Sequence, residues 1–128
     1  MANATTITIN DLTANGSIAA PTAQILDTGT ADVVLETAAT SDMDRIIIEV
    51  SNTATEDLVV VIEAGESPPA FRNSLGDVTS AAIADNARRI FGPFESARFA
   101  QADGKLQVTF APGGTIAATF VCYRLPKV

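Results

Sequence analysis

The chain has 128 residues, a length that fits one domain and leaves little room for a second. Hydrophobic residues make up 47% of it and charged residues 18%, a balance that argues against general disorder. Its formal net charge of −7 opposes binding to nucleic-acid phosphates and to anionic lipid surfaces. We therefore expect neither nucleic acid nor membrane among its partners.

The first part of the chain predicts three short strands. Residues 6–10 alternate polar and isoleucine side chains, which puts Ile7 and Ile9 on one face. The polar, small-residue stretch 11–21 follows as a loop or an arm, and strands are predicted at 23–27 and 32–37. The chain thus divides into an N-terminal strand with its arm or loop, 1–21, and a β-sandwich domain, 22–128, within a single domain overall.

The centre of the chain carries the strongest strand patterns, at 45–50 and 57–63. Residues 51–56 between them have the chemistry of a hairpin loop. Near-continuous apolar runs are typical of central strands with both faces covered or one face docked on a partner. The predicted inward side chains of the two strands are Ile46, Ile48, Val50, Leu58, Val60 and Ile62.

The pattern breaks over residues 64–76, which contain two prolines and two glycines and predict a long loop of the kind that is often functional. For 77–90 we prefer a hairpin over one or two helical turns. Its strands are placed at 78–83 and 88–91 and its turn at 84–87. Pro93 then indicates a sheet edge or a bulge.

The last part of the chain predicts strands at 97–101 and 105–110 around the pair Asp103-Gly104, a strong hairpin signal. A tight turn at 111–114 leads into a final strand at 115–125. Three alternating side chains of the 105–110 strand are expected to face inward, namely Leu106, Val108 and Phe110.

Together these patterns predict an all-β domain of eight or nine short strands with little or no helix. The connections are too short for helical crossovers, so the sheets should be mainly antiparallel. A sandwich or a barrel is the expected architecture.

The residue types of the chain exclude or disfavour several kinds of catalytic and binding site. The chain has no histidine, which excludes Cys-His and Ser-His catalysis, and its single Cys122 lies in an apolar run typical of a small core residue. The absence of Trp and the single Tyr argue against a sugar-binding cleft. Close acidic pairs such as Asp42 with Asp44 are interpreted as solvated loop charges. No catalytic, cofactor-binding or metal site is predicted, and we expect a protein that is not an enzyme.

Two groups of residues are candidates for partner binding. Phe71 and Arg72 lie in a proline-stiffened loop and either cap one end of the core or form a contact point for a partner. Arg88, Arg89 and Arg98 cluster on an otherwise acidic chain. They either pair with exposed carboxylates on neighbouring strands or dock onto an acidic patch of another subunit.

Most of the chain also loosely resembles a known group of proteins. The motifs are Gly92-Pro93-Phe94-Glu95-Ser96-Ala97-Arg98-Phe99, Gln101-Ala102-Asp103-Gly104 and Leu106-Gln107-Val108-Thr109-Phe110, with Tyr123-Arg124-Leu125-Pro126 and Thr5-Thr6-Ile7-Thr8-Ile9 in the same style. They resemble small structural proteins of tailed bacteriophages, the head decoration or cement proteins. The resemblance implies a β-sandwich or jelly-roll domain, often trimeric, bound at symmetry-related sites on the capsid exterior. It implies no catalytic residues and no cofactor.

The function we expect is therefore a non-enzymatic viral structural protein that binds the exterior of a phage capsid and stabilises it. Its partners would be the major capsid protein and further copies of itself in a trimer. We expect it at the capsid surface of the virion, made in the host cytoplasm without a signal peptide. An alternative is a tail- or fibre-associated adhesin domain that binds a host-surface glycan. A third, an enzyme domain, would need a dry pocket with perturbed carboxylates.

Overall fold

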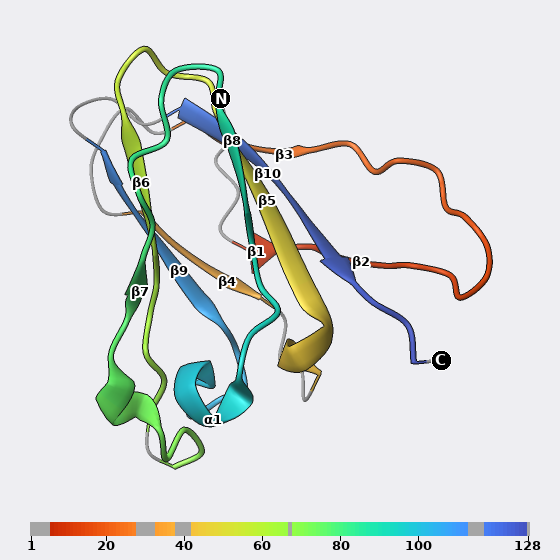
Figure 1. The fold of residues 1–128 in the computed structure, drawn as a ribbon, viewed down its shortest axis with the longest axis vertical. Helices are drawn as coiled ribbons and strands as arrows, with labels where there is room; N and C mark the ends of the chain where they lie inside the picture. Colours follow the sequence, from red (N-terminus) through yellow and green to blue (C-terminus); the bar gives the residue numbers. More distant parts are fainter. Residues whose placement is uncertain (1–5, 28–32, 38–41, 67, 113–116, 128) are drawn as a thin grey trace.

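The computed structural model describes residues 6–27, 33–37, 42–66, 68–112 and 117–127, and these form an all-β protein with almost no helix (Figure 1). Sheet A has the strand order β1 (Thr6–Ile7), β4 (Val33–Thr37), β9 (Gln107–Pro112), β6 (Leu58–Ile62) and β7 (Val78–Thr79). Sheet B has the order β2 (Ile9–Asp11), β10 (Ala117–Arg124), β5 (Ile46–Asn52) and β8 (Arg88–Phe91), and β3 (Gln24–Asp27) also pairs with β10. Three short helices complete the described elements, η1 (Met43–Arg45), η2 (Asn73–Leu75) and α1 (Ser96–Phe99).

The pairing is antiparallel between most neighbouring strands, as predicted. Among the described strands, only β1 with β4 and β2 with β10 run parallel. Both exceptions involve the short N-terminal strands. The all-β prediction is confirmed, whereas the jelly-roll connectivity implied by the resemblance stays a prediction.

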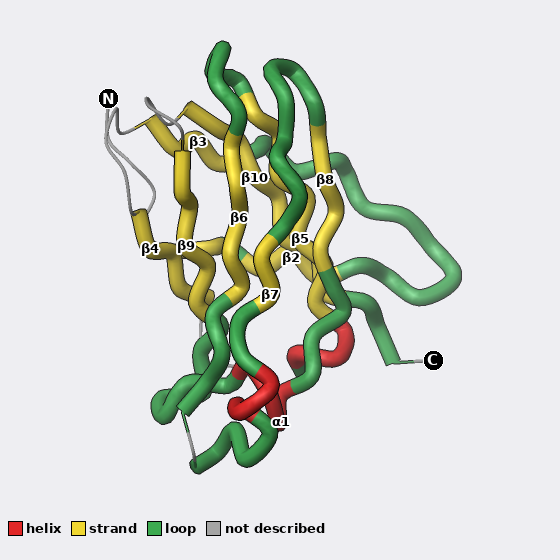
Figure 2. Tube along the Cα trace, turned by 60° about the vertical axis from the view of Figure 1, so that its left-hand side comes forward, coloured by secondary structure: helices red, strands yellow, loops and turns green. Residues whose placement is uncertain are grey.

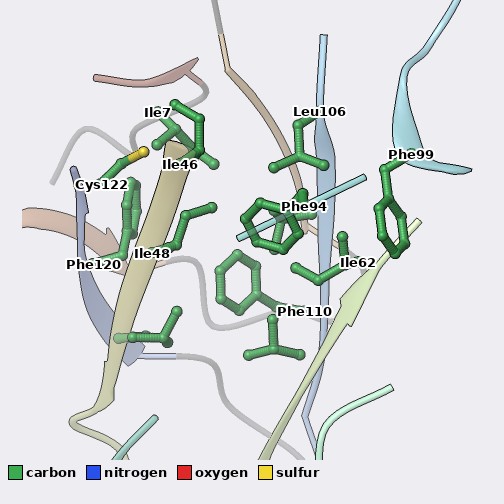
Figure 3. Packing of buried hydrophobic residues seen from close by; sticks show 14 of the residues in the cluster. Ile7, Ile46, Ile48, Ile62, Phe94, Phe99, Leu106, Phe110, Phe120 and Cys122 are labelled. Atoms are coloured by element: carbon green, nitrogen blue, oxygen red, sulfur yellow. The ribbon is translucent and has the colours of Figure 1, made fainter. Parts of the chain in front are cut away.

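One hydrophobic core lies between the two sheets. The alternating burial of β5, β6 and β10 sends every second side chain inward, as period-two patterns require. Figure 3 shows side chains of both sheets meeting in this space. The edge-to-face pair of Phe94 and Phe99, with ring centroids 6.0 Å apart, extends the core beside α1. Large side chains with less than 2% exposure are Phe110, Phe120, Ile7, Met43, Ile46, Ile48, Leu58, Ile62, Ile83 and Leu106.

The N-terminal strand divides between the two sheets. Ile7 is buried and Ile9 packs against the core, so the predicted shared face is confirmed, but the pairing is broken at Thr8. The side-chain amide of Gln24 accepts a hydrogen bond from the Thr8 amide at 2.8 Å and donates one to the Thr6 carbonyl at 2.9 Å. These bonds satisfy the backbone at the point where the chain passes from sheet A to sheet B.

Two predicted hairpins are wrong for one reason. β5 and β6 belong to different sheets, and so do β7 and β8. Because β5 and β6 each bury one apolar face in the same core from opposite sides, the loop at 51–56 must cross between sheets instead of folding back within one. The buried Asn52 holds this crossing, donating to the carbonyls of Glu56 at 2.7 Å and Ile83 at 2.8 Å and accepting from the Ala54 amide.

The segment between β7 and β8 keeps only part of the predicted pairing. The strand predicted at 78–83 is limited to β7 at Val78–Thr79, and Ile83 forms only an isolated bridge with Leu58. The predicted turn at 84–87 is present, with the Ala87 amide donating to the Ala84 carbonyl at 2.9 Å.

The predicted strand at 97–101 is instead the helical turn α1. The amides of Phe99 and Ala100 each donate to the carbonyl four residues earlier at 3.0 Å, and this turn buries Phe99. The Asp103-Gly104 turn exists, with Gly104 at φ +81°, but it joins α1 to β9 and not two strands. The predicted turn at 111–114 lies partly outside the described residues.

Removal of a core ring tests the packing. We expect Phe120→Ala to lower the free energy of unfolding by about 3–5 kcal/mol, since it leaves a cavity between the sheets. Phe71→Ala is the matched control, because Phe71 is 76% exposed and Phe120 only 1%. It should change stability by no more than about 0.5 kcal/mol in chemical denaturation. Equal losses for the two variants would contradict the assignment of the core.

Candidate partner-binding surface

The structure separates the five predicted binding residues into two places. Arg88 and Arg89 lie at the start of β8, at the edge of sheet B. Phe71, Arg72 and Arg98 lie around η2 and α1, at the end of the molecule drawn lowest in Figure 1. The three arginines that cluster in sequence therefore do not form one patch.

Arg98 is engaged within the fold. Its Nε donates to the Gly76 carbonyl at 3.1 Å, and its Nη2 donates to the Leu75 carbonyl at 3.3 Å. The guanidinium carbon also lies 5.0 Å from the centroid of the Phe99 ring. These contacts hold the end of η2 against α1, which gives Arg98 a structural role.

Arg72 also ties the long loop to α1, while Phe71 points into solvent. Arg72 forms an ion pair with Glu95, and its amide donates to the Ala97 carbonyl at 2.7 Å. The neighbouring Ala70 is fully buried. Phe71 therefore does not cap the core, and its ring stays available at this end of the molecule.

The segment 92–99, which carries much of the family resemblance, serves packing. Gly92 has φ +113°, and a Cβ there would lie 2.4 Å from the Ile46 carbonyl oxygen. Phe94 and Phe99 are buried, and together with Ile62, Phe91 and others they line a hollow of about 260 Å³. This segment closes one end of the core.

The two arginines of β8 have no such engagement. Arg88 and Arg89 are exposed, and within the described residues neither forms an ion pair or a side-chain hydrogen bond. Pairing with carboxylates on neighbouring strands, one of the two interpretations of the sequence, is therefore not seen in this part of the chain. Two cationic groups on a chain of net charge −7 are left facing solvent.

The backbone of β8 is also open on one side. The Asn52 amide donates to the Ala87 carbonyl at 3.0 Å, which fixes the phase of the antiparallel ladder between β5 and β8. Because hydrogen-bonded pairs alternate, Arg89 and Phe91 direct their backbone groups toward β5. Arg88 and Ile90 direct their N–H and C=O groups away from it. β8 is the terminal strand in the order of sheet B.

A hollow adjoins this open edge. It has a volume of about 490 Å³ and lies between β8 and the segment that precedes it, near the buried Ile83. Its lining residues are Ala82, Ile83, Ala84, Ala87, Arg88, Arg89 and Ile90.

The solvent-facing side of sheet B extends from β8 across β5 and β10 to β3. Strand register places Ile90 beside Glu49, Glu49 beside Val121, and Thr119 beside Ile25. Ile90 is 67% exposed and Ile25 is 47% exposed, at opposite margins of the face. The outer face thus carries an exposed isoleucine at each margin, with Glu49, Val121 and Thr119 between them, and we take it as the candidate contact surface. We call β8 together with this outer face the sheet B surface.

The N-terminal segment projects beside the sheet B surface. The loop between β2 and β3 extends away from both sheets in Figures 1 and 2 and carries Ile18 at 36% exposure. Its base is fixed by the Asp11–Arg124 ion pair and by a 2.9 Å bond from the Leu12 amide to the Arg124 carbonyl. The hydrogen bond from Arg124 holds the pKa of the Asp11 carboxyl below its usual value.

Sequence reasoning selected Arg88 and Arg89 and predicted a sheet edge or a bulge at Pro93, but it missed Ile90. Ile90 follows two arginines and precedes Phe91, and such a run gives no indication that its side chain is exposed. Only the partition of β7 and β8 between two sheets makes β8 an edge strand. In the described part of the chain, no group of three or more His, Cys, Asp or Glu residues could hold a metal ion. Among the same residues, no helix is long and apolar enough to cross a membrane.

Comparison with known proteins finds no matching family model, no matching curated protein and no matching solved structure. The surface must therefore be interpreted from its own geometry.

The Asp11–Arg124 pair predicts a pH dependence of stability. Because the folded-state pKa of Asp11 is lowered from 3.8, its stabilising contribution is present above that pH and is lost as the pH falls below it. We expect the difference in unfolding free energy between wild type and Asp11→Asn to shrink between about pH 7 and about pH 2. Asp85→Asn, which removes an exposed turn carboxylate, is the control for the change in net charge. A difference that is constant with pH would contradict the assignment.

The buried Cys122 predicts a thiol that is inert in the folded state. Burial raises its pKa to about 12, so the thiol stays protonated at neutral and mildly alkaline pH. We expect no reaction with a disulfide reagent such as Ellman's reagent until the protein unfolds. The unfolded thiol ionises first, so stability should also fall as the pH rises from about 9 toward 12, and less so in Cys122→Ala. Rapid labelling under native conditions would show that Cys122 is accessible.

Proposed function

We propose that this chain is a non-enzymatic structural protein that binds the outside of a phage capsid and stabilises it. The observation that carries the proposal is the sheet B surface, where the exposed Ile90 lies on an open strand edge beside Arg88 and Arg89, which form no ion pair within the described residues, and Ile25 is exposed at the opposite margin. Exposed apolar side chains beside arginine favour a protein partner, since both are enriched at protein interfaces.

The capsid as partner is supported by the family resemblance, whose motifs lie in residues 92–110 and also at 5–9 and 123–126. Residues 92–110 build the end of the core and β9, so this part of the resemblance concerns the scaffold, and the sheet B surface is the proposed contact. Many copies on a symmetric lattice would let a modest contact per copy give strong overall binding. We propose a trimer as the bound form, because the resemblance implies one.

Co-sedimentation tests this function. We expect the purified protein to sediment with expanded phage capsids assembled from the major capsid protein, to saturate at a fixed number of copies, and to raise the melting temperature of the capsid. Ile90→Glu, which puts a charge on the sheet B surface, should weaken binding by about tenfold or more. Phe71→Glu alters an equally exposed apolar side chain at the other end of the molecule and is the matched control.

A monomer that fails to sediment with expanded capsids would overturn the proposal. Loss of binding in Phe71→Glu but not in Ile90→Glu would keep the function and move the contact to the η2 end. Binding to a host glycan instead of capsids would favour the adhesin alternative.

A further inference from the structure

The open edge of β8 offers main-chain groups to an additional strand. The N–H and C=O of Arg88 and Ile90 point away from β5 and have no hydrogen-bond partner among the described residues. An added strand would lie about 4.8 Å from β8. A hollow of about 490 Å³, lined by residues of β8 and of the segment before it, adjoins the strand. Strand addition to an exposed edge is a general mode of peptide recognition.

The two arginines of β8 determine which kind of strand can pair with this edge favourably. Arg88 shares the outer face with Ile90, whereas Arg89 pairs with the inward Val50 and so lies on the other face. A strand beside β8 thus meets a guanidinium on each face. Acidic residues opposite Arg88 and Arg89 would be favourable cross-strand partners, and basic residues would be repelled.

A second copy of this chain is a poor occupant. Antiparallel pairing of β8 with β8 of another copy would place four arginines within one short ladder. Like charges directly opposite in a ladder are destabilising. The arginines thus disfavour self-pairing of the edge while leaving it open to an acidic strand.

We propose that β8 takes up an extended acidic segment of a protein partner as an additional, antiparallel strand of sheet B. The segment presents acidic side chains opposite Arg88 and Arg89 and an apolar side chain opposite Ile90. This inference rests on the proposed binding function, but it does not require the partner to be a capsid protein.

The test uses the full chain labelled with ¹⁵N and the synthetic peptide acetyl-Thr-Val-Glu-Glu-Thr-Val-amide, whose two acidic residues fall opposite Arg89 and Arg88. We expect the amide signals of Arg88 and Ile90 to shift on titration and their hydrogen exchange to slow. A peptide with Lys in place of Glu should not bind. A peptide N-methylated at the residues opposite Ile90 and Arg88 keeps its charge but loses the ladder hydrogen bonds, and it should not bind either.

Variants of the protein separate the backbone contribution from the charge. Arg88→Glu should weaken peptide binding by about tenfold, and Lys127→Glu, which makes the same change in net charge, should not. Ile90→Pro removes the outward N–H and should abolish binding, whereas Ile90→Thr keeps it. If Ile90→Pro does not fold, the N-methylated peptide decides the same point.

Equal binding of the N-methylated peptide, or signal shifts confined to other strands, would overturn strand addition. Equal binding of the Lys peptide would overturn the selection for an acidic segment. The proposed function fails separately. Peptide binding at β8 without co-sedimentation would keep strand addition and remove the capsid. If Arg88→Glu sediments with capsids as well as the wild type does and no peptide binds, the capsid function is kept and strand addition at β8 is overturned.

Discussion

The structure depends on one constraint, the burial of alternating apolar faces from both sheets in a single core. β5 and β6 are consecutive in sequence and both have a fully buried face, yet they reach the core from opposite sides. The chain must therefore cross between sheets where a simple meander would turn back within one. A crossing leaves backbone groups that no ladder satisfies, and at two crossings amide side chains accept or donate the missing hydrogen bonds. Asn52 does so after β5 and Gln24 does so at Thr8.

The same constraint creates the sheet B surface. Because the chain crosses between β7 and β8, β7 joins the edge of sheet A and β8 becomes the edge of sheet B. An edge strand is a hazard unless charge or cover protects it. At β8 the protection is two arginines on a chain whose overall charge is negative. Like charges on the edge disfavour pairing of β8 with β8 of another copy, and they underlie the proposal that an acidic strand binds there.

The sequence correctly predicted the strands in which every second side chain is buried. It did not predict which strands pair with one another, because that pairing depends on residues far apart in the chain. The predicted inward side chains are buried as expected, because the apolar residues of these segments alternate with the period of a strand. They are Ile46, Ile48, Val50, Leu58, Val60, Ile62, Leu106, Val108 and Phe110. The hairpins failed because loop chemistry at 51–56 does not reveal which sheet the next strand joins. Residues 97–101 became a helical turn because Phe99 and the Phe94 ring pack at the end of the core, which overrides strand propensity. For the candidate surface, the sequence pointed to Arg88 and Arg89 as binding residues. That these arginines lie on an open edge strand depends on the strand order, which the sequence does not reveal.

The most direct test is hydrogen–deuterium exchange of the chain, free and bound to the proposed capsid partner. The account predicts protection concentrated in residues 88–91, with smaller protection on the outer face of β10 and little change in residues 70–76. Protection confined to residues 70–76, or a bound state in which 88–91 exchanges as fast as in the free protein, would contradict it.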